Sequence, residues 1–256
     1  MKTEELIVKT KIAAVSYLNA KPLTYTFESG DLKDLIELDF FYPSEVATRL
    51  IENKADVALL PVEALLSLNE YHIISDYCIS TEGEVASVCL FSDVPLEKIK
   101  TVLLDYQSRT SVALLKILLR DYWKISPELI NASEGYESKI TDTTAGLVIG
   151  DRALKQRKMS KYIYDLGMAW KELTGKPFVF AVWAANKKID KGFIELFNRA
   201  NQEGIKNIEK ISSEIFFPEY NLHQYFTQNI NYELDERKRE SITFFLNRVK
   251  EYNLFT

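Results

Sequence analysis

The chain has 256 residues and a formal net charge of −5; 46% of its residues are hydrophobic and 27% are charged. This composition is ordinary for a globular protein, so it excludes a largely disordered chain, and the length suits one large domain or two small ones. A nucleic-acid partner is not expected, because the net charge is negative and the Lys/Arg block at 155–158 is short.

Targeting and cofactor motifs are missing from the sequence. The first six residues are polar and acidic, and no apolar run is long enough to cross a bilayer, so we expect a cytoplasmic protein without a membrane partner. Neither a G-x-G-x-x-G nor a P-loop pattern occurs, and His72 and His223 stand far apart, so we expect no nucleotide cofactor and no metal. Cys78 and Cys89 have no CxxC spacing and are expected to be buried free thiols.

Taken in chain order, short apolar runs alternate with segments of helical period. We predict strands at 12–15, 35–41 and 55–60, with a helix between the last two that Ser44 caps. Strands that are apolar on nearly every residue are typical of a parallel sheet covered on both faces. The same patterns predict a helix around 62–68 and strands at 72–79 and 86–92.

A second α/β unit begins with a predicted strand at 101–105, which leads through a polar loop into a helix with one apolar face. Later strands are predicted at 145–151, 162–167 and 178–184. From Asp190 onwards the pattern is helical, so this C-terminal segment must pack on elements that precede it.

These patterns predict an α/β protein of two lobes. We expect the first lobe to comprise 1–92 and 185–256 and the second 93–184, with the helical C-terminal segment packed on the first lobe. The chain would then cross between the lobes near Ser92 and Ala184. Two crossings beside a cleft are typical of a ligand-binding protein whose lobes move about a hinge.

Polar residues follow the predicted strands, at the edge where an open α/β sheet binds its ligand. Ser16, Tyr17 and Asn19 follow the first strand and offer a hydroxyl, a phenol and a carboxamide. Such a loop can orient a polar ligand by hydrogen bonds, but without an acid or an imidazole its pattern is not that of a nucleophile or a metal site. The alternative is an ordinary turn before a helix, and the residues alone leave both open.

The loop 108–111 contains three hydroxyls and a guanidinium at a predicted helix start: Ser108, Arg109, Thr110 and Ser111. Backbone N–H groups and the helix dipole favour an anion there, so the loop predicts a carboxylate site. Alternatively Ser108 only caps the helix and Arg109 points into solvent. Further candidates are Gly150 and Asp151, where Asp151 is either a helix cap or a carboxylate at the cleft, and Ser87, whose default role is structural.

Several stretches together resemble the menaquinone-biosynthesis enzymes of the futalosine route, and among them the chorismate dehydratases. The resemblance covers about residues 11–184. It rests on the following segments, in order: 15–23 (VSYLNAKPL), 56–62 (DVALLPV), 87–88 (SV), 108–115 (SRTSVALL), 149–154 (IGDRAL), 165–167 (DLG) with Trp170, and 174–183 (TGKPFVFAVW).

The resemblance implies a fold similar to type II periplasmic binding proteins, with a ligand cleft between two lobes. It also implies loss of water from chorismate to give 3-[(1-carboxyvinyl)oxy]benzoate, with chorismate as the small-molecule partner and no cofactor. On this basis Asn19 is expected to hold the substrate's hydroxyl or carboxylate. Proton removal is expected from Asp151 or from the substrate's own enolpyruvyl carboxylate.

Two other readings remain open at this point. One is the sibling 1,4-dihydroxy-6-naphthoate synthase of the same route, although the forms Ser-Tyr-Leu-Asn and Ser-Arg-Thr-Ser favour the dehydratase. The other is a cytoplasmic sensor that binds a small carboxylate without converting it. The sequence leaves the oligomeric state undecided between a monomer and a homodimer.

Overall fold

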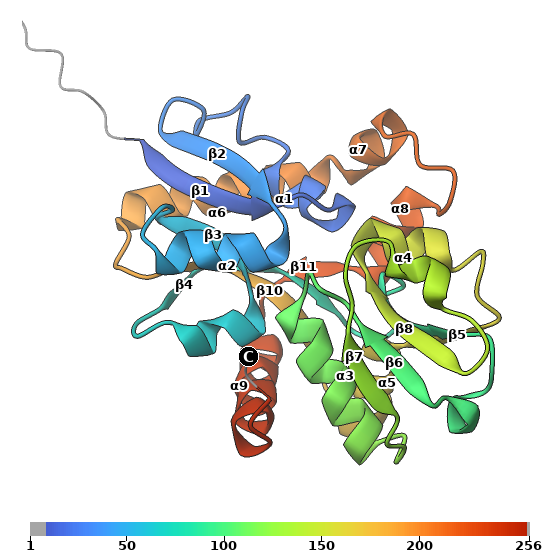
Figure 1. Ribbon diagram of the computed structural model, residues 1–256. Coiled ribbons are helices and arrows are strands. Elements are labelled where there is room, and N and C mark those ends of the chain that lie inside the picture. Colours follow the sequence, from blue (N-terminus) through green and yellow to red (C-terminus); the bar gives the residue numbers. More distant parts are fainter. Residues whose placement is uncertain (1–8, 255–256) are drawn as a thin grey trace, which may run out of the picture.

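The computed structural model describes residues 9–254, which form two α/β lobes built on separate sheets (Figure 1). The expectations for the first six residues lie outside this range. The first sheet has six strands, in the order β11 (Asn231–Glu233), β4 (His72–Thr81), β10 (Phe178–Ala185), β3 (Val57–Pro61), β1 (Thr10–Val15) and β2 (Ile36–Phe41). The second has five, in the order β7 (Glu128–Asn131), β6 (Thr101–Leu104), β8 (Thr144–Ile149), β5 (Val88–Ser92) and β9 (Tyr162–Asp165).

Both sheets are mixed, whereas the sequence predicts a parallel one. β1 runs parallel to β2 and β3, but β10 is antiparallel to both β3 and β4. In the second sheet β6 is parallel to β7 and β8, and β5 is antiparallel to β8 and β9. An apolar run indicates burial on both faces, but it carries no information about the direction of the neighbouring strand.

The helices cover the faces of these sheets (Figure 1). The α-helices are α1 (Lys21–Thr24), α2 (Pro43–Ile51), α3 (Arg109–Asp121), α4 (Gly150–Gln156), α5 (Leu166–Thr174), α6 (Lys191–Lys206), α7 (Ile208–Glu214), α8 (Leu222–Gln224) and α9 (Glu236–Glu251). Shorter turns are the 3₁₀ helices η1 (Leu18–Ala20), η2 (Val62–Ser67), η3 (Leu96–Lys98) and η4 (Tyr136–Lys139) and the π-helical turn η5 (Tyr225–Asn229).

Two local expectations differ from the structure. Tyr42, not Ser44, is the N-cap of α2, because Pro43 takes the first helical position, where its missing N–H costs nothing. The helical C-terminal segment also contains a strand, β11, which adds to the edge of the first sheet beside β4. Three residues are too few to produce a recognisable strand period, so the pattern does not reveal it.

The strands divide between the lobes differently from the expected boundaries of 1–92 plus 185–256 and 93–184. β5 pairs in the second sheet and β10 in the first, so the chain crosses between the sheets at 82–87 and 175–177 rather than near Ser92 and Ala184. Only long-range pairing decides to which sheet an apolar strand belongs. We propose that the lobes divide at these two crossings.

The C-terminal helices pack mainly on the first lobe. α6 covers β4 and α1, and α9 lies on β10 and η2. α9 also reaches the second lobe, where Arg248 Nη1 lies 2.5 Å from Asp121 Oδ2 at the end of α3. α9 therefore ties both lobes together on the side away from β1 (Figure 1).

The core contains two of the three tryptophans and both cysteines. Trp170 and Trp183 have no exposed surface, and Trp170 meets the rings of Phe178 and Phe245 edge-on. Such contacts add about 0.5–1.5 kcal/mol each to the free energy of burial. Both cysteines are buried free thiols, as expected. Between residues 9 and 254, every helix is too short or too polar to cross a bilayer.

Candidate functional site

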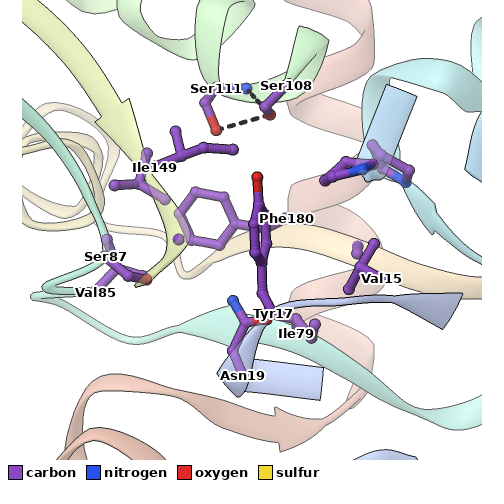
Figure 2. Close-up of a pocket in the computed structure, with 15 residues that line it drawn as sticks. Val15, Tyr17, Asn19, Ile79, Val85, Ser87, Ser108, Ser111, Ile149 and Phe180 are labelled. Carbon is purple, nitrogen blue, oxygen red and sulfur yellow. Dashed lines mark hydrogen bonds between the residues drawn. The ribbon is translucent and has the colours of Figure 1, made fainter. Parts of the chain in front are cut away.

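A cavity of about 50 Å³ lies between the lobes, at the ends of β1, β5, β8 and the start of α3. Figure 2 shows Ser108 and Ser111 on one side of it and Asn19 on the other, with the Tyr17 ring between them. The lining residues are Val15, Tyr17, Asn19, Pro43, Pro61, Ile79, Val85, Ser87, Val88, Ser108, Ser111, Ile149, Gly150, Phe180 and Ala181.

None of these fifteen lining residues has a charged side chain. Their polar groups are hydroxyls, one phenol and one carboxamide, set among aliphatic and aromatic surfaces. In a cavity of low polarity such groups form stronger hydrogen bonds than they do in water. The site can therefore orient a polar ligand, and the volume admits about three or four water molecules when the walls are together.

The loop after β1 contributes two of its three predicted residues. Tyr17 and Asn19 line the cavity, and the Asn19 Oδ1 atom is buried without a hydrogen-bond partner. Ser16 is exposed and does not line the cavity, because its backbone N–H continues the β1–β2 pairing by donating to Phe41 O, 3.0 Å away. The unpaired amide oxygen of Asn19 is an acceptor available to a ligand.

The start of α3 contributes Ser108 and Ser111. Ser108 is the N-cap, as the alternative reading of this loop holds: its Oγ accepts from Ser111 N at 3.1 Å, and the two hydroxyls lie 3.0 Å apart. Thr110 is buried and accepts a hydrogen bond from Glu63 N of the other lobe, 3.0 Å away. Arg109 is exposed and does not line the cavity. Ser108 and Ser111 thus form the helix cap and also line the cavity.

Ser87 enters the cavity from an unusual turn. Ala86 has φ +62°, and Ser87 N donates to Val85 O at 2.7 Å, which makes a γ-turn of the rarer, left-handed kind. The half-buried Asp165 carboxylate holds this turn by accepting from the N–H groups of Val85 and Ala86 at 3.1 and 2.8 Å. Strain of about 1–3 kcal/mol is expected in such a turn and is typical of functional sites.

Gly150 and Asp151 begin α4 and lie against the loop that carries Asn19. Gly150 lines the cavity with φ +62°, and a Cβ there would lie 3.0 Å from the Tyr17 ring, so glycine is required. The Asp151 carboxylate accepts from Leu18 N at 3.0 Å and does not line the cavity. Burial raises the pKa of Asp151, while that hydrogen bond and the charges of Lys155 and Lys21 lower it.

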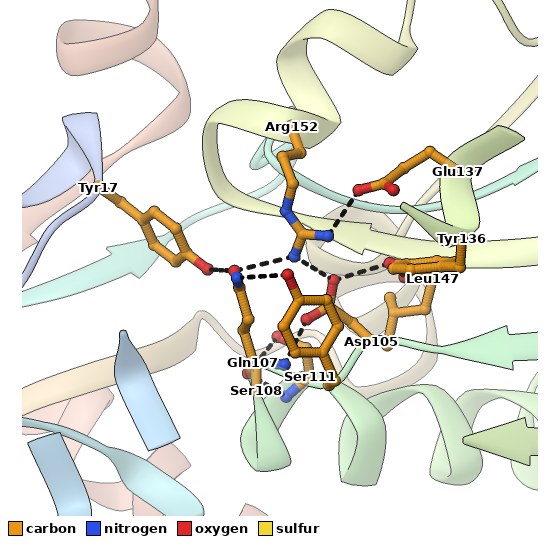
Figure 3. A network of polar contacts seen from close by, with 10 residues as sticks. Tyr17, Asp105, Gln107, Ser108, Ser111, Tyr136, Glu137, Leu147 and Arg152 are labelled. Atoms are coloured by element: carbon orange, nitrogen blue, oxygen red, sulfur yellow. Dashed lines mark hydrogen bonds and ion pairs between the residues drawn. The ribbon is translucent and has the colours of Figure 1, made fainter. Parts of the chain in front are cut away.

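Behind the cavity lies a network of polar contacts, shown in Figure 3. The Tyr17 hydroxyl donates to Gln107 Oε1, which also accepts from Arg152 Nη2 at 2.9 Å. Arg152 in turn contacts Asp105 Oδ2 and Glu137 Oε1, each at 2.6 Å. Tyr17 therefore links the cavity wall of the first lobe to an ion-pair cluster in the second.

The charges of this cluster are balanced within it. The Asp105 side chain has no exposed surface; burial raises its pKa, and Arg152 and the Tyr136 hydroxyl lower it. Burial also raises the pKa of Tyr17, so that the phenol stays neutral and remains a donor. Because one guanidinium faces two carboxylates, the cluster leaves no spare positive charge beside the cavity.

The sequence reasoning missed Gln107, Arg152, Phe180 and Tyr225. Arg152 follows Gly150-Asp151 in the segment 149–154, on which the family resemblance rests. An arginine two residues after a glycine at a strand end is a signal that could have identified it as a site residue. Tyr225 donates to Ser87 Oγ at 2.7 Å from a segment more than a hundred residues away in sequence, and nothing local reveals it. Residues that reach a site from distant parts of the chain cannot be identified from local sequence patterns.

Comparison with known sequences gives two matches of interest. Residues 10–251 match the model of a family described as menaquinone biosynthesis. The chain is also 27% identical over 253 residues to a protein named chorismate dehydratase from Thermus thermophilus, a match that covers 90% of this chain and 91% of that one.

Comparison with solved structures identifies the fold. A protein from Archaeoglobus fulgidus superposes with a TM-score of 0.75 at 16% identity, covering 96% of this chain and 98% of that one. The alkanesulfonate-binding protein of Xanthomonas axonopodis pv. citri, bound to MOPS, gives a TM-score of 0.65 at 11% identity, covering 97% and 94%. A periplasmic aliphatic sulphonate binding protein from Escherichia coli gives 0.62 at 13%, covering 96% and 93%. The fold is that of periplasmic binding proteins, as the sequence predicts.

Proposed function

The chain belongs to the menaquinone biosynthesis family, and from this we propose that it is a chorismate dehydratase of the futalosine route, forming 3-[(1-carboxyvinyl)oxy]benzoate and water. The observation that carries the proposal is the chemistry of the cavity wall: hydroxyls and one unpaired carboxamide oxygen, without an acid or an imidazole. Such a wall suits a reaction that needs orientation of the substrate more than strong acid–base chemistry.

The reaction removes the C3 proton and the C4 hydroxyl of chorismate, and the electrons of the C3–H bond complete an aromatic ring. Aromatisation supplies a large driving force, so the enzyme has mainly to align the breaking bonds. Asn19 Oδ1 would accept a hydrogen bond from the C4 hydroxyl, and Ser87 lies on the same side of the cavity. Asn19 is thus the first candidate for a catalytic residue.

Two groups are candidates for the base, as the sequence left open. The hydrogen bond from Leu18 N to the Asp151 carboxylate supports a positioning role for Asp151 on the loop that carries Asn19. We therefore favour the substrate's enolpyruvyl carboxylate, which is attached through oxygen at C3 and can reach the C3 proton. Asp151→Asn separates the two, because loss of a general base costs about 10²–10⁴-fold in kcat.

The two carboxylates of chorismate need compensation in an uncharged cavity. Ser108 and Ser111 lie at the N-terminus of α3, a helix of 13 residues, and the helix dipole would favour one carboxylate there. Admission of the substrate requires the walls to separate, which breaks the contacts Tyr17–Gln107 and Leu18–Asp151 between the lobes. Closing over the substrate would reform them.

The decisive experiment incubates the purified protein with chorismate and follows the aromatic product by ultraviolet absorbance and mass spectrometry. The expected result is stoichiometric conversion to 3-[(1-carboxyvinyl)oxy]benzoate without an added metal or cofactor. If chorismate binds but stays intact, the protein is a sensor. If it is inert towards chorismate, formation of 1,4-dihydroxy-6-naphthoate is the next assay, and a positive result there replaces the proposal.

A further inference from the structure

Tyr225 is a buried phenol next to the cavity that the mechanism above does not use. It opens the π-helical turn η5, has no exposed surface, and does not line the cavity. Its hydroxyl donates to Ser87 Oγ at 2.7 Å, and it also contacts the Asn19 side chain. A single π-turn inside a helical segment is often found at functional sites. Tyr225 therefore touches both polar side chains on this side of the cavity from behind.

The direction of these hydrogen bonds follows from the protons available. A neutral phenol has one proton, and burial keeps Tyr225 neutral by raising its pKa. That proton is used in the bond to Ser87 Oγ, so the serine oxygen accepts and its own proton must point elsewhere. The Asn19 side chain also lowers the pKa of Tyr225, as a donor to the phenol oxygen does, and Asn19 Oδ1 is buried without a partner. We infer that the amide nitrogen of Asn19 is directed at the phenol and that Oδ1 is left for a ligand.

We propose that Tyr225 is a positioning residue that fixes the polarity of the site, with Ser87 as a hydrogen-bond donor and Asn19 as an acceptor facing the substrate. The inference rests on the proposed function. One donor beside one acceptor matches an alcohol, which both gives and receives a hydrogen bond. In the reaction, Ser87 donates a hydrogen bond to the C4 oxygen as its bond to carbon breaks, while Asn19 Oδ1 accepts a hydrogen bond from the C4 hydroxyl. The hydroxyl leaves as water by taking up the C3 proton, which the enolpyruvyl carboxylate of the substrate removes and passes on.

The backbone of Ser87 supports this assignment because it cannot rearrange easily. The γ-turn at Ala86 is held by Asp165 from one side, and Ala86 O accepts from Arg157 Nη1 at 3.2 Å. Ser87 O accepts from Gly150 N at 2.8 Å. These hydrogen bonds hold the main chain on both sides of Ser87, so its side-chain hydroxyl is the part that can still rotate. The hydrogen bond from Tyr225 sets that rotation.

The test is a double-mutant cycle on chorismate turnover with Tyr225→Phe, Ser87→Ala and the double variant. Ser87→Ala is expected to lower kcat by about 10²-fold, as loss of a donor to a developing oxyanion does. Tyr225→Phe keeps the ring and is expected to lower kcat about tenfold with little change in KM, because Ser87 then turns freely. In the double variant the part of the Tyr225→Phe loss that acts through Ser87 is already gone, so the combined loss is expected to be smaller than the product of the two single losses.

Tyr232→Phe is the matched control, since it removes a buried hydroxyl that has no hydrogen-bond partner among the described residues. It is expected to leave kcat unchanged. If Tyr225→Phe does not fold, 3-fluorotyrosine at this position serves instead: its more acidic phenol donates more strongly to Ser87, and kcat is expected at or above the wild-type value. Loss of activity with 3-fluorotyrosine would count against the inference.

The outcomes separate the inference from the function on which it rests. A wild-type protein that leaves chorismate unchanged overturns the proposed function, and this inference with it. An active wild type in which the two substitutions multiply in the double variant overturns the inference alone. The same follows if Tyr225→Phe folds and keeps full kcat, or if its loss appears only in KM.

Discussion

The two walls of the cavity are built by different means. The wall from the first lobe, with Val15, Asn19 and Phe180, is mostly apolar and offers a single unpaired acceptor. The wall from the second lobe, with Ser108 and Ser111, is hydroxylic and is backed by ion pairs that the cavity does not reach. The difference teaches that the charged groups behind this cavity hold its polar wall in place and do not line the cavity themselves.

The largest effect is expected from breaking the ion pairs behind the second wall. Arg152→Met leaves Asp105 buried without its cation, which is expected to lower the free energy of unfolding by about 3–5 kcal/mol. Urea denaturation followed by circular dichroism measures it. Arg120→Met is the control, because Arg120 is exposed and its ion pair with Asp121 is 3.9 Å long. Equal stability of the two variants would show that the cluster does not support the wall.

The next effect tests the single acceptor of the first wall. Asn19→Ala removes the unpaired Oδ1 atom and is expected to lower kcat/KM for chorismate by about 10²–10³-fold without loss of stability. Ser16→Ala in the same loop is the control, since Ser16 is exposed and lies outside the cavity. Normal turnover by Asn19→Ala would remove its assigned role.

A smaller effect is expected where the two walls meet. Gly150→Ala puts a Cβ 3.0 Å from the Tyr17 ring and a non-glycine residue at φ +62°. We expect a loss of about 1–3 kcal/mol in stability and a raised KM, because the Tyr17 ring is pushed into the cavity. Thermal unfolding and steady-state kinetics measure the two parts. An unchanged melting temperature would mean that the contact is not tight.

Asp151→Asn is expected to change kcat by less than about tenfold, because the amide oxygen can still accept from Leu18 N. Its effect on stability depends on pH. The folded-state pKa of Asp151 is raised above 3.8 by burial, so its contribution favours folding below the unfolded value and is lost as pH rises through the folded value. The melting temperature of the variant relative to wild type should therefore rise with pH over that interval. A loss above 10²-fold in kcat would instead identify Asp151 as the base.

The smallest effect is expected at Arg109, the cation that the sequence suggests for the anion site. Because its side chain is exposed and does not line the cavity, Arg109→Ala should change kcat/KM by less than about twofold and stability by less than about 0.5 kcal/mol. A loss of more than tenfold would show that the second wall does present a charge to the substrate.

The sequence by itself determined the local parts of this protein. Apolar runs predict most strands within a few residues, and the hydroxyls at 108–111 predict a helix start, with Ser108 as its cap in one of the two readings that the sequence left open. Caps, strands and helix faces depend on neighbours a few residues apart, so their signal is present in any short window. Tyr17, Asn19, Ser87 and Gly150 could be singled out for the same reason: each follows a strand or sits beside one.

Only the tertiary structure decided the rest. Arg109 and Arg152 both lie in the first turn of a helix that follows a strand, yet one points into solvent and the other enters a cluster with two carboxylates. The sheets exchange β5 and β10 relative to the expected lobes, and Tyr225 reaches Ser87 from the far end of the chain. Each outcome depends on which distant segments pack together, and this is fixed by the summed burial and hydrogen bonding of the whole fold.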